Sequence, residues 1–125
     1  MLTTMMENVV KHAQRKMADI DAVAVAKGPG SYTGLRIGTA TAKGLCFALD
    51  KPLIGVNSLT AMATALQAQA PGDHWFCPMI DARRMEVYCA IYDQQLEEHQ
   101  ATEAKIVGQE SFKEILTDRP MVFFG

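Results

Sequence analysis

A short apolar run that ends in a glycine-rich turn and leads directly into a helical pattern constrains the fold more than any other feature of the sequence. Residues 22–26 read Ala-Val-Ala-Val-Ala, and an unbroken apolar run of this length is typical of a strand that is buried on both faces of a parallel sheet. Gly-Pro-Gly at 28–30 ends the run, and a helix is predicted from Tyr32 or Thr33 to Leu49. A strand, a tight turn and a helix in this order predict a mixed fold in which helices pack on a sheet.

The rest of the chain alternates helices with short strands. Apolar residues recur at helical spacing from Leu2 to Met17 and predict an amphipathic first helix. Ser58 is a good N-cap for a later helix, and the stretch after Asp93 is polar and weakly patterned. The other expected elements are a strand at 53–56, a helix at 58–70, a hairpin of strands at 75–80 and 85–92, a short helix at 109–116 and a strand at 121–124. This order is typical of α/β or α+β organisation.

The composition limits the classes of protein to which the chain can belong. The chain has 125 residues, is 49% hydrophobic and carries a formal net charge of −2, which is enough for one small domain with a core. The near-neutral charge argues against a dedicated nucleic-acid binder. No signal peptide and no membrane-spanning run is recognised, and three cysteines without a Cys-x-x-Cys pair are typical of reduced, buried thiols in the cytoplasm.

The glycine-rich turn is a candidate anion site, because glycines allow close approach of the backbone and free N–H groups at a helix start attract negative charge. Its spacing matches neither the Walker loop nor the dinucleotide fingerprint. The alternative, favoured by the spacing alone, is a tight strand–helix connection that Ser31 or Thr33 caps. One glycine should then adopt a positive φ, and Gly30→Val should damage folding. The candidate anion-binding residues are Gly28, Gly30, Ser31, Thr33 and Gly34.

The second predicted helix carries two rows of small residues. One row is Gly34, Gly38 and Ala42, and the other is Ala40, Gly44 and Ala48. One row can pack closely on the chain's own sheet, and a second row indicates either a second close neighbour or a shared internal core. Together with the methionine-rich first helix this predicts an interface for a partner. The candidate interface residues are Leu2, Met5, Met6, Val9, Gly38, Ala40 and Gly44.

The predicted hairpin turn contains Asp81-Ala82-Arg83-Arg84. Asp81 is expected to accept a hydrogen bond from the turn backbone, and Arg83 or Arg84 to pair with Glu86. The alternative is that Asp81 and Arg83 face a partner or a ligand.

No catalytic constellation and no metal site is predicted. The three histidines lie far apart on different expected elements, and no His-x-x-x-His or His-Glu-x-x-His pair exists. Ser31 has no histidine nearby in the sequence to activate it.

Several segments together resemble the TsaB (YeaZ) family. The glycine-rich block with its following helix is highly specific, and the other matches follow in the same order, with the similarity becoming thin after Asp93. The matching segments are 19–25, 28–38, 41–45, 51–56, 81–84 and 86–88. The resemblance implies an α/β fold of the actin-like, Hsp70-like and ribonuclease H-like group. It also implies a single partial domain, with residues 1–57 as the rest of a first lobe and residues 58–125 as the start of a second. The N-terminal strands and the C-terminal part of the family are expected to be missing.

The resemblance further implies a non-catalytic scaffold subunit that binds TsaD, the enzyme that transfers threonylcarbamoyl to adenosine 37 of tRNA. The implied partners are TsaD and TsaE, with a homodimer when the subunit is alone, only indirect contact with tRNA, and no membrane. No cofactor of its own is implied, and a nucleotide would bind only in the full complex. The metal-binding histidine pair of the catalytic relatives would precede Met1, and His12 does not match it. The alternative function is a glycoprotease-like peptidase, or a nucleotide-dependent hydrolase that uses the Gly-Pro-Gly loop.

Overall fold

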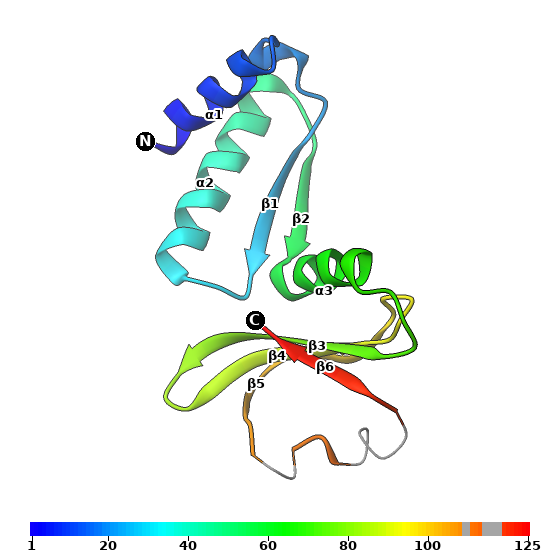
Figure 1. Cartoon of the computed structure of the whole chain (residues 1–125). Coiled ribbons are helices and arrows are strands. Elements are labelled where there is room, and N and C mark those ends of the chain that lie inside the picture. The colour runs from blue at the N-terminus through cyan, green and yellow to red at the C-terminus, as the bar shows by residue number, and fades with distance from the viewer. Residues whose placement is uncertain (109–110, 114–118) are drawn as a thin grey trace. The chain divides into compact units, whose positions relative to one another are not determined.

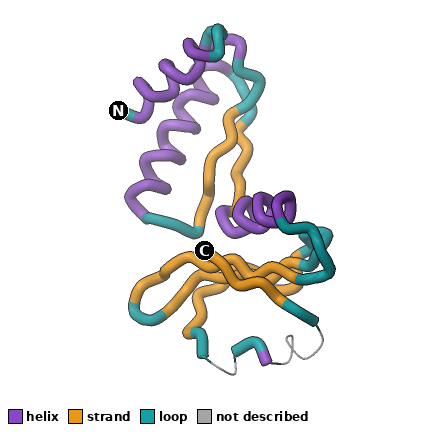
Figure 2. The backbone as a smooth tube through the Cα atoms, in the orientation of Figure 1, coloured by secondary structure: helices purple, strands orange, loops and turns teal. Residues whose placement is uncertain are grey.

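The computed structural model describes residues 1–108, 111–113 and 119–125, and these form two compact units (Figure 1). Unit 1 comprises residues 1–56 and unit 2 residues 57–125. Each unit is an assembly of helices and strands, as the colouring in Figure 2 shows. The mixed composition confirms the α/β character predicted from the sequence. The assignment of residues 1–57 and 58–125 to two lobes stays a prediction.

Unit 1 is built on the predicted strand–turn–helix. Strand β1 (Val23–Gly28) is followed by helix α2 (Tyr32–Leu49) and strand β2 (Leu53–Asn57). The two strands are neighbours in a two-stranded sheet and run in the same direction in Figure 1, with α2 as the crossover between them. The backbone N–H of Val23 donates to Pro52 O at 3.0 Å, where the pairing begins.

Helix α1 (Leu2–His12) is shorter than predicted, because the apolar spacing that extends to Met17 does not belong to one helix. The chain leaves the helix at Gln14, which has a φ of 58°. The N–H of Arg15 donates to Val10 O at 3.1 Å and that of Gln14 to Lys11 O at 2.9 Å, a hydrogen-bonded pattern that closes helix ends. Met17 lies in a separate 3₁₀ turn (Met17–Asp19).

The prediction that β1 is buried on both faces is wrong. Val23 and Val25 are half-buried, whereas Ala24 and Ala26 are exposed. Helix α2 packs on the valine face, where a Cβ built on Gly38 would lie 3.7 Å from Val25 Cγ2. The described elements of unit 1 thus cover one face of this strand and leave the other open.

Unit 2 is a four-stranded sheet in the order β5-β4-β3-β6. Strand β3 (Trp75–Arg83) pairs antiparallel with β4 (Glu86–Tyr92) and parallel with β6 (Met121–Phe124), and β4 pairs antiparallel with β5 (Glu98–Ile106). The hairpin and the last strand confirm the prediction. Strand β5 was not predicted, since its polar sequence carries no clear apolar alternation. The helix expected at 109–116 falls largely outside the described residues.

Helix α3 (Ser58–Gln69) begins one residue earlier than its predicted cap implies. Asn57, rather than Ser58, is the N-cap, because its Oδ1 accepts from the N–H of Leu59 at 2.8 Å and of Thr60 at 3.2 Å. The side chain of Asn57 also donates to Thr102 Oγ1 at 3.0 Å, which joins the helix start to β5.

Alternate residues of β3 and β4 supply two buried clusters, one of them lined by α3. The first cluster consists of Leu59, Ala63, Phe76, Ala90 and Tyr92, and the Tyr92 hydroxyl lies 2.7 Å from Thr60 Oγ1. The second cluster consists of Cys77, Cys89, Ile91 and Phe112.

The cysteines of the chain are free and buried, as predicted. Burial, together with the neighbouring Cys89 thiol, raises the pKa of Cys77 to about 12. This thiol therefore stays protonated and packs as a small apolar group. Within the described ranges, no helix combines the length and the apolar character that crossing a membrane would require.

Candidate functional site

The glycine-rich loop joins β1 to α2 and positions the start of that helix. Ser31 is the N-cap, and its Oγ accepts from the N–H of Gly34 at 3.4 Å. The predicted positive φ is found at Gly28, at 111°. These contacts support the loop as a capped strand–helix connection. Binding of an anion by Gly28, Gly30, Ser31, Thr33 and Gly34 stays a prediction.

The structure indicates that a side chain is less well tolerated at Gly28 than at Gly30. A Cβ built on Gly28 would lie 3.3 Å from Leu35 Cδ1, which adds a close contact to a backbone conformation that L-residues avoid. A Cβ on Gly30 would lie 3.9 Å from the same side chain, which is ordinary van der Waals contact. The positive φ and the closer contact make Gly28 the more constrained of the two glycines, and the expected damage to folding by Gly30→Val stays a prediction.

The two rows of small residues on α2 face different surroundings. Gly38 lies against Val25, and Ala42 is buried with 4% of its surface exposed, so this part of the row faces the interior of unit 1, whereas Gly34 is exposed. In the other row, Ala40, Gly44 and Ala48 are exposed, and a Cβ on Gly44 would meet nothing within 4 Å. Of the predicted interface residues on α2, the structure therefore places Ala40 and Gly44 on the surface and Gly38 half-buried against β1.

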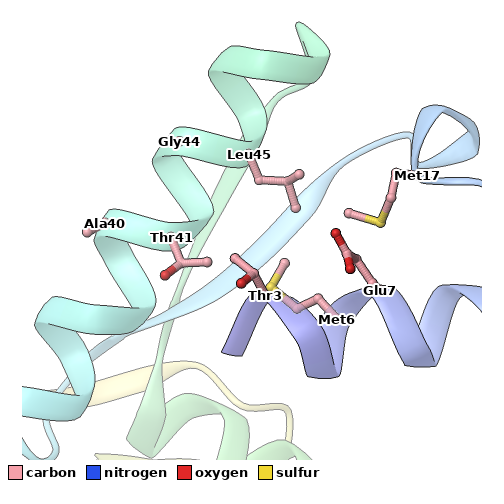
Figure 3. Close-up of a pocket in the computed structure, with 8 residues that line it drawn as sticks. All are labelled: Thr3, Met6, Glu7, Met17, Ala40, Thr41, Gly44 and Leu45. Atoms are coloured by element: carbon pink, nitrogen blue, oxygen red, sulfur yellow. The ribbon is translucent and has the colours of Figure 1, made fainter. Parts of the chain in front are cut away.

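A hollow of about 310 Å³ lies between α1 and α2, and Ala40 and Gly44 of the open row are among the residues that line it (Figure 3). In this view the side chains of Met6 and Thr3 rise from α1 toward Thr41 and Leu45 of α2. Met6 and Leu2 are half-buried, whereas Met5 and Val9 expose 64% and 68% of their surface. We call the residues of this region the α1–α2 surface: Leu2, Met5, Met6, Val9, Ala40 and Gly44.

Two further features make this part of unit 1 unusually apolar. A second hollow, of about 460 Å³, runs between α1 and the start of β1 and is lined mainly by apolar side chains that include Leu2, Met5 and Val10. On α2, Phe47 exposes 91% of its surface. Exposed apolar residues gathered in this way are a common feature of protein-binding surfaces.

The prediction of turn chemistry in the β3–β4 hairpin is confirmed in one part and wrong in the other. Asp81 Oδ1 accepts from the N–H of Arg83 at 2.8 Å, as expected of an aspartate at a turn. In the described part of the chain, however, neither Arg83 nor Arg84 forms an ion pair with Glu86. The register between the strands shifts between Asp81 and Arg83.

The structure brings together one polar pair that the sequence did not predict. His99 Nε2 lies 2.8 Å from Asp93 Oδ2, and the His99 ring stacks on Trp75 with centroids 4.1 Å apart. The guanidinium of Arg119 lies 3.8 Å from the centre of the same indole ring. These side chains line a polar hollow of about 520 Å³. The only sign of this pair in the sequence was the short separation of Asp93 and His99, which lie on either side of a short turn between strands.

Asp93 is held as a carboxylate. Burial by itself would raise its pKa, but hydrogen bonds from His99 and from the backbone N–H groups of Glu97 and Gln95 outweigh that effect and lower the pKa. Its Oδ1 accepts both backbone bonds at 2.9 Å, so the side chain closes the β4–β5 turn. Within residues 1–108, 111–113 and 119–125, no group of three or more histidine, cysteine or acidic side chains is arranged to hold a metal.

Comparison with known proteins identifies the family. The sequence model of the family described as "TsaD: tRNA N6-adenosine threonylcarbamoyltransferase" matches residues 1–115. The chain is 39% identical over 115 residues to the Bacillus subtilis "tRNA threonylcarbamoyladenosine biosynthesis protein TsaB", an alignment that covers 86% of this chain and 47% of that protein. It is 39% identical over 88 residues to the protein of the same name from Escherichia coli, covering 70% of this chain and 38% of that protein.

The chain belongs to the TsaB (YeaZ) family, within the TsaD-related superfamily. The solved structure "YeaZ from Pseudomonas aeruginosa" agrees with a TsaB-type fold, with a TM-score of 0.71 at 27% identity over 99% of this chain and 67% of that one. This likeness confirms the actin-like, ribonuclease H-like fold class. The chain spans less than half the length of these two curated TsaB relatives.

The two glycines of the loop make a matched pair for testing the strand–helix connection. Gly28→Ala should lower the free energy of unfolding by about 1–3 kcal/mol, because Ala must adopt the left-handed φ. Gly30→Ala should change it by no more than about 0.5 kcal/mol. Chemical denaturation followed by circular dichroism measures both. Equal effects of the two substitutions would contradict the assignment of the constraint to Gly28.

Asp93 should make unfolding depend on pH in the acidic range. Its folded pKa lies below the ordinary value of 3.8, so its stabilising contribution is present in full above that value, declines as the pH falls below it and is absent beneath the folded pKa. Asp93→Asn should cost about 1–3 kcal/mol near pH 7 and reduce the loss of stability on acidification. Denaturant unfolding at a series of pH values checks this, with the exposed Asp21→Asn as the matched control that should retain the wild-type profile. Identical profiles for Asp93→Asn and the wild-type protein would refute the role of Asp93.

Proposed function

We propose that the chain acts as a non-catalytic partner subunit in the biosynthesis of threonylcarbamoyladenosine in tRNA. In this role it binds a TsaD-type threonylcarbamoyltransferase through the α1–α2 surface. The observation that carries the proposal is the exposed row of small residues on α2 beside the exposed apolar side chains of α1. The names of the curated TsaB relatives support the process in which it acts.

The composition of the surface fits a helical partner. Gly44 leaves open space next to the helix axis, so that another helix can approach closely. Met5 and Met6 have flexible, polarisable side chains, which adapt to more than one partner shape. A second copy of the chain would then compete with the transferase for the same surface, and the subunit alone would form a homodimer.

The remaining parts of the proposal concern the assembled complex. TsaE joins the complex, and tRNA is contacted by the transferase rather than by this subunit. Any nucleotide binds in the full complex, and the subunit works in the cytoplasm. The reduced state of the three buried cysteines is consistent with that compartment.

The catalytic part of the proposal is tested on the purified chain. We expect neither threonylcarbamoyl transfer to tRNA nor peptidase activity from the chain alone. Ser31→Ala should leave any background signal in these assays unchanged, because Ser31 Oγ serves as a helix cap. Transfer assays with radiolabelled threonine, and peptidase assays on a panel of peptides, make the measurement. Turnover by the isolated chain that Ser31→Ala abolishes would instead establish the hydrolase alternative.

The interface is tested by two substitutions that spare the fold. Met5→Lys places a charge on an exposed position, and Gly44→Leu fills the hollow beside α2. Both should weaken binding to the full-length TsaD-type transferase of the same organism by about tenfold or more, which corresponds to about 1.4 kcal/mol. Gly44→Leu should also raise the stability of the chain by up to about 1 kcal/mol, because Gly is a poor helix former.

Calorimetric titration with the transferase measures affinity, and thermal unfolding by circular dichroism measures stability. Thr4→Lys is the matched control, since Thr4 is exposed on α1 and lies outside both apolar hollows. It should bind as tightly as the wild-type protein. If Met5→Lys and Gly44→Leu remain folded and bind the transferase normally, the contact lies on another surface and the proposal fails.

A further inference from the structure

The tip of the β3–β4 hairpin has a backbone conformation that its residues disfavour. Arg83, Arg84 and Met85 have φ values of 67°, 55° and 66°. Since Arg83 pairs with Glu86, Arg84 and Met85 form a two-residue turn with positive φ at both positions. Turns of this kind ordinarily carry Asn-Gly or Asp-Gly, because other L-residues are strained there.

The rest of the hairpin holds this tip in place. Strand β4 is paired with β3 and with β5 as far as Glu86, whereas β3 is paired with β4 as far as Arg83 and with β6 only over residues 75–78. The hydrogen bond from the N–H of Arg83 to Asp81 Oδ1 fixes the bulge that precedes the turn. The tip is thus held by the β3–β4 pairing and by β5 beside β4, and strain at such a position indicates a function other than folding.

The side chains of the tip are exposed and unengaged. Arg83 and Arg84 are exposed, and 89% of the Met85 surface is accessible. Among the residues that the structure describes, neither guanidinium group has a hydrogen-bond acceptor or an ion-pair partner. Two free guanidinium groups beside an exposed thioether form a compact surface that is both cationic and apolar.

We propose that this hairpin tip, Arg83-Arg84-Met85, is a second contact with the transferase and recognises a carboxylate-bearing protein surface beside an apolar pocket. The inference rests on the proposed function. The guanidinium group of arginine forms paired hydrogen bonds with carboxylates. The apolar side chain of Met85 would be removed from water in an apolar pocket of the partner. Arginine and methionine are both enriched at protein interfaces.

A protein surface fits the tip better than RNA does. Asp81 and Glu86 flank the two arginines, and Asp and Glu outnumber Lys and Arg in unit 2. These carboxylates would repel a continuous phosphate backbone, whereas a single carboxylate can approach one guanidinium group. The phosphate backbone also offers no apolar pocket for Met85.

The test replaces the tip by the residues that its conformation prefers. The double variant Arg84→Asn/Met85→Gly should raise the midpoint of thermal unfolding, because the strain is relieved. It should also weaken binding to the full-length transferase by about tenfold or more, because the contact is lost. Asp50→Gly is the matched control. Asp50 lies outside the hairpin and has a φ of 54°, in the left-handed region that favours glycine. This variant should therefore be more stable than the wild-type chain and bind the transferase normally.

The outcomes separate this inference from the proposed function. If the double variant is more stable and binds as tightly as the wild-type chain, the tip is only a turn and the inference is wrong. If it gains no stability, the strain on which the inference depends is absent. If the wild-type chain does not bind the transferase at all, the inference and the proposed function both fail. If transcribed tRNA binds the wild-type chain and the variant loses that binding, the tip recognises phosphate, and the proposed partner class is overturned.

Discussion

The left-handed turn at Gly28 is the constraint on which unit 1 depends. A φ of 111° ends β1 and starts α2 within a few residues, and Ser31 caps the helix where the turn releases the chain. The direction that α2 takes then sets which of its faces meets the strand. Gly38 lies against Val25, so Ala40 and Gly44, on another face of the same helix, are left on the surface. The candidate interface is therefore a geometric consequence of the turn.

Local signals in the sequence were sufficient for much of this architecture. The Gly-Pro-Gly turn, the cap at Ser31 and the hairpin around Asp81 each depend on residues close together in the chain, and each is found in the structure. The cysteines were also predictable, because three thiols without a paired motif behave as small apolar residues. Local chemistry also predicted that one loop glycine would adopt a positive φ, although it did not single out Gly28.

Features that depend on how the elements are covered, paired or turned in the fold were not predictable. The apolar run of β1 indicates burial on two faces, but burial depends on the elements that cover the strand, and Ala24 and Ala26 are exposed. Strand β5 is an edge strand with charged residues, which suppress the alternation that identifies strands. The Asp93–His99 pair forms only because the β4–β5 turn brings the two side chains together.

Several of the remaining departures from local rules are at exposed positions. Gly44 weakens α2 without packing against anything, and Arg84 and Met85 occupy a turn that suits Asn-Gly. A chain selected for folding alone would replace these residues, since stabilising substitutions at such sites are readily found. Under the proposed function, a partner that binds the folded chain at these positions would offset their cost, because binding to the native state stabilises it in proportion to the logarithm of partner concentration. The stability of the subunit would then depend on the presence of its partner, and the residues that destabilise it in isolation would be those that the complex requires.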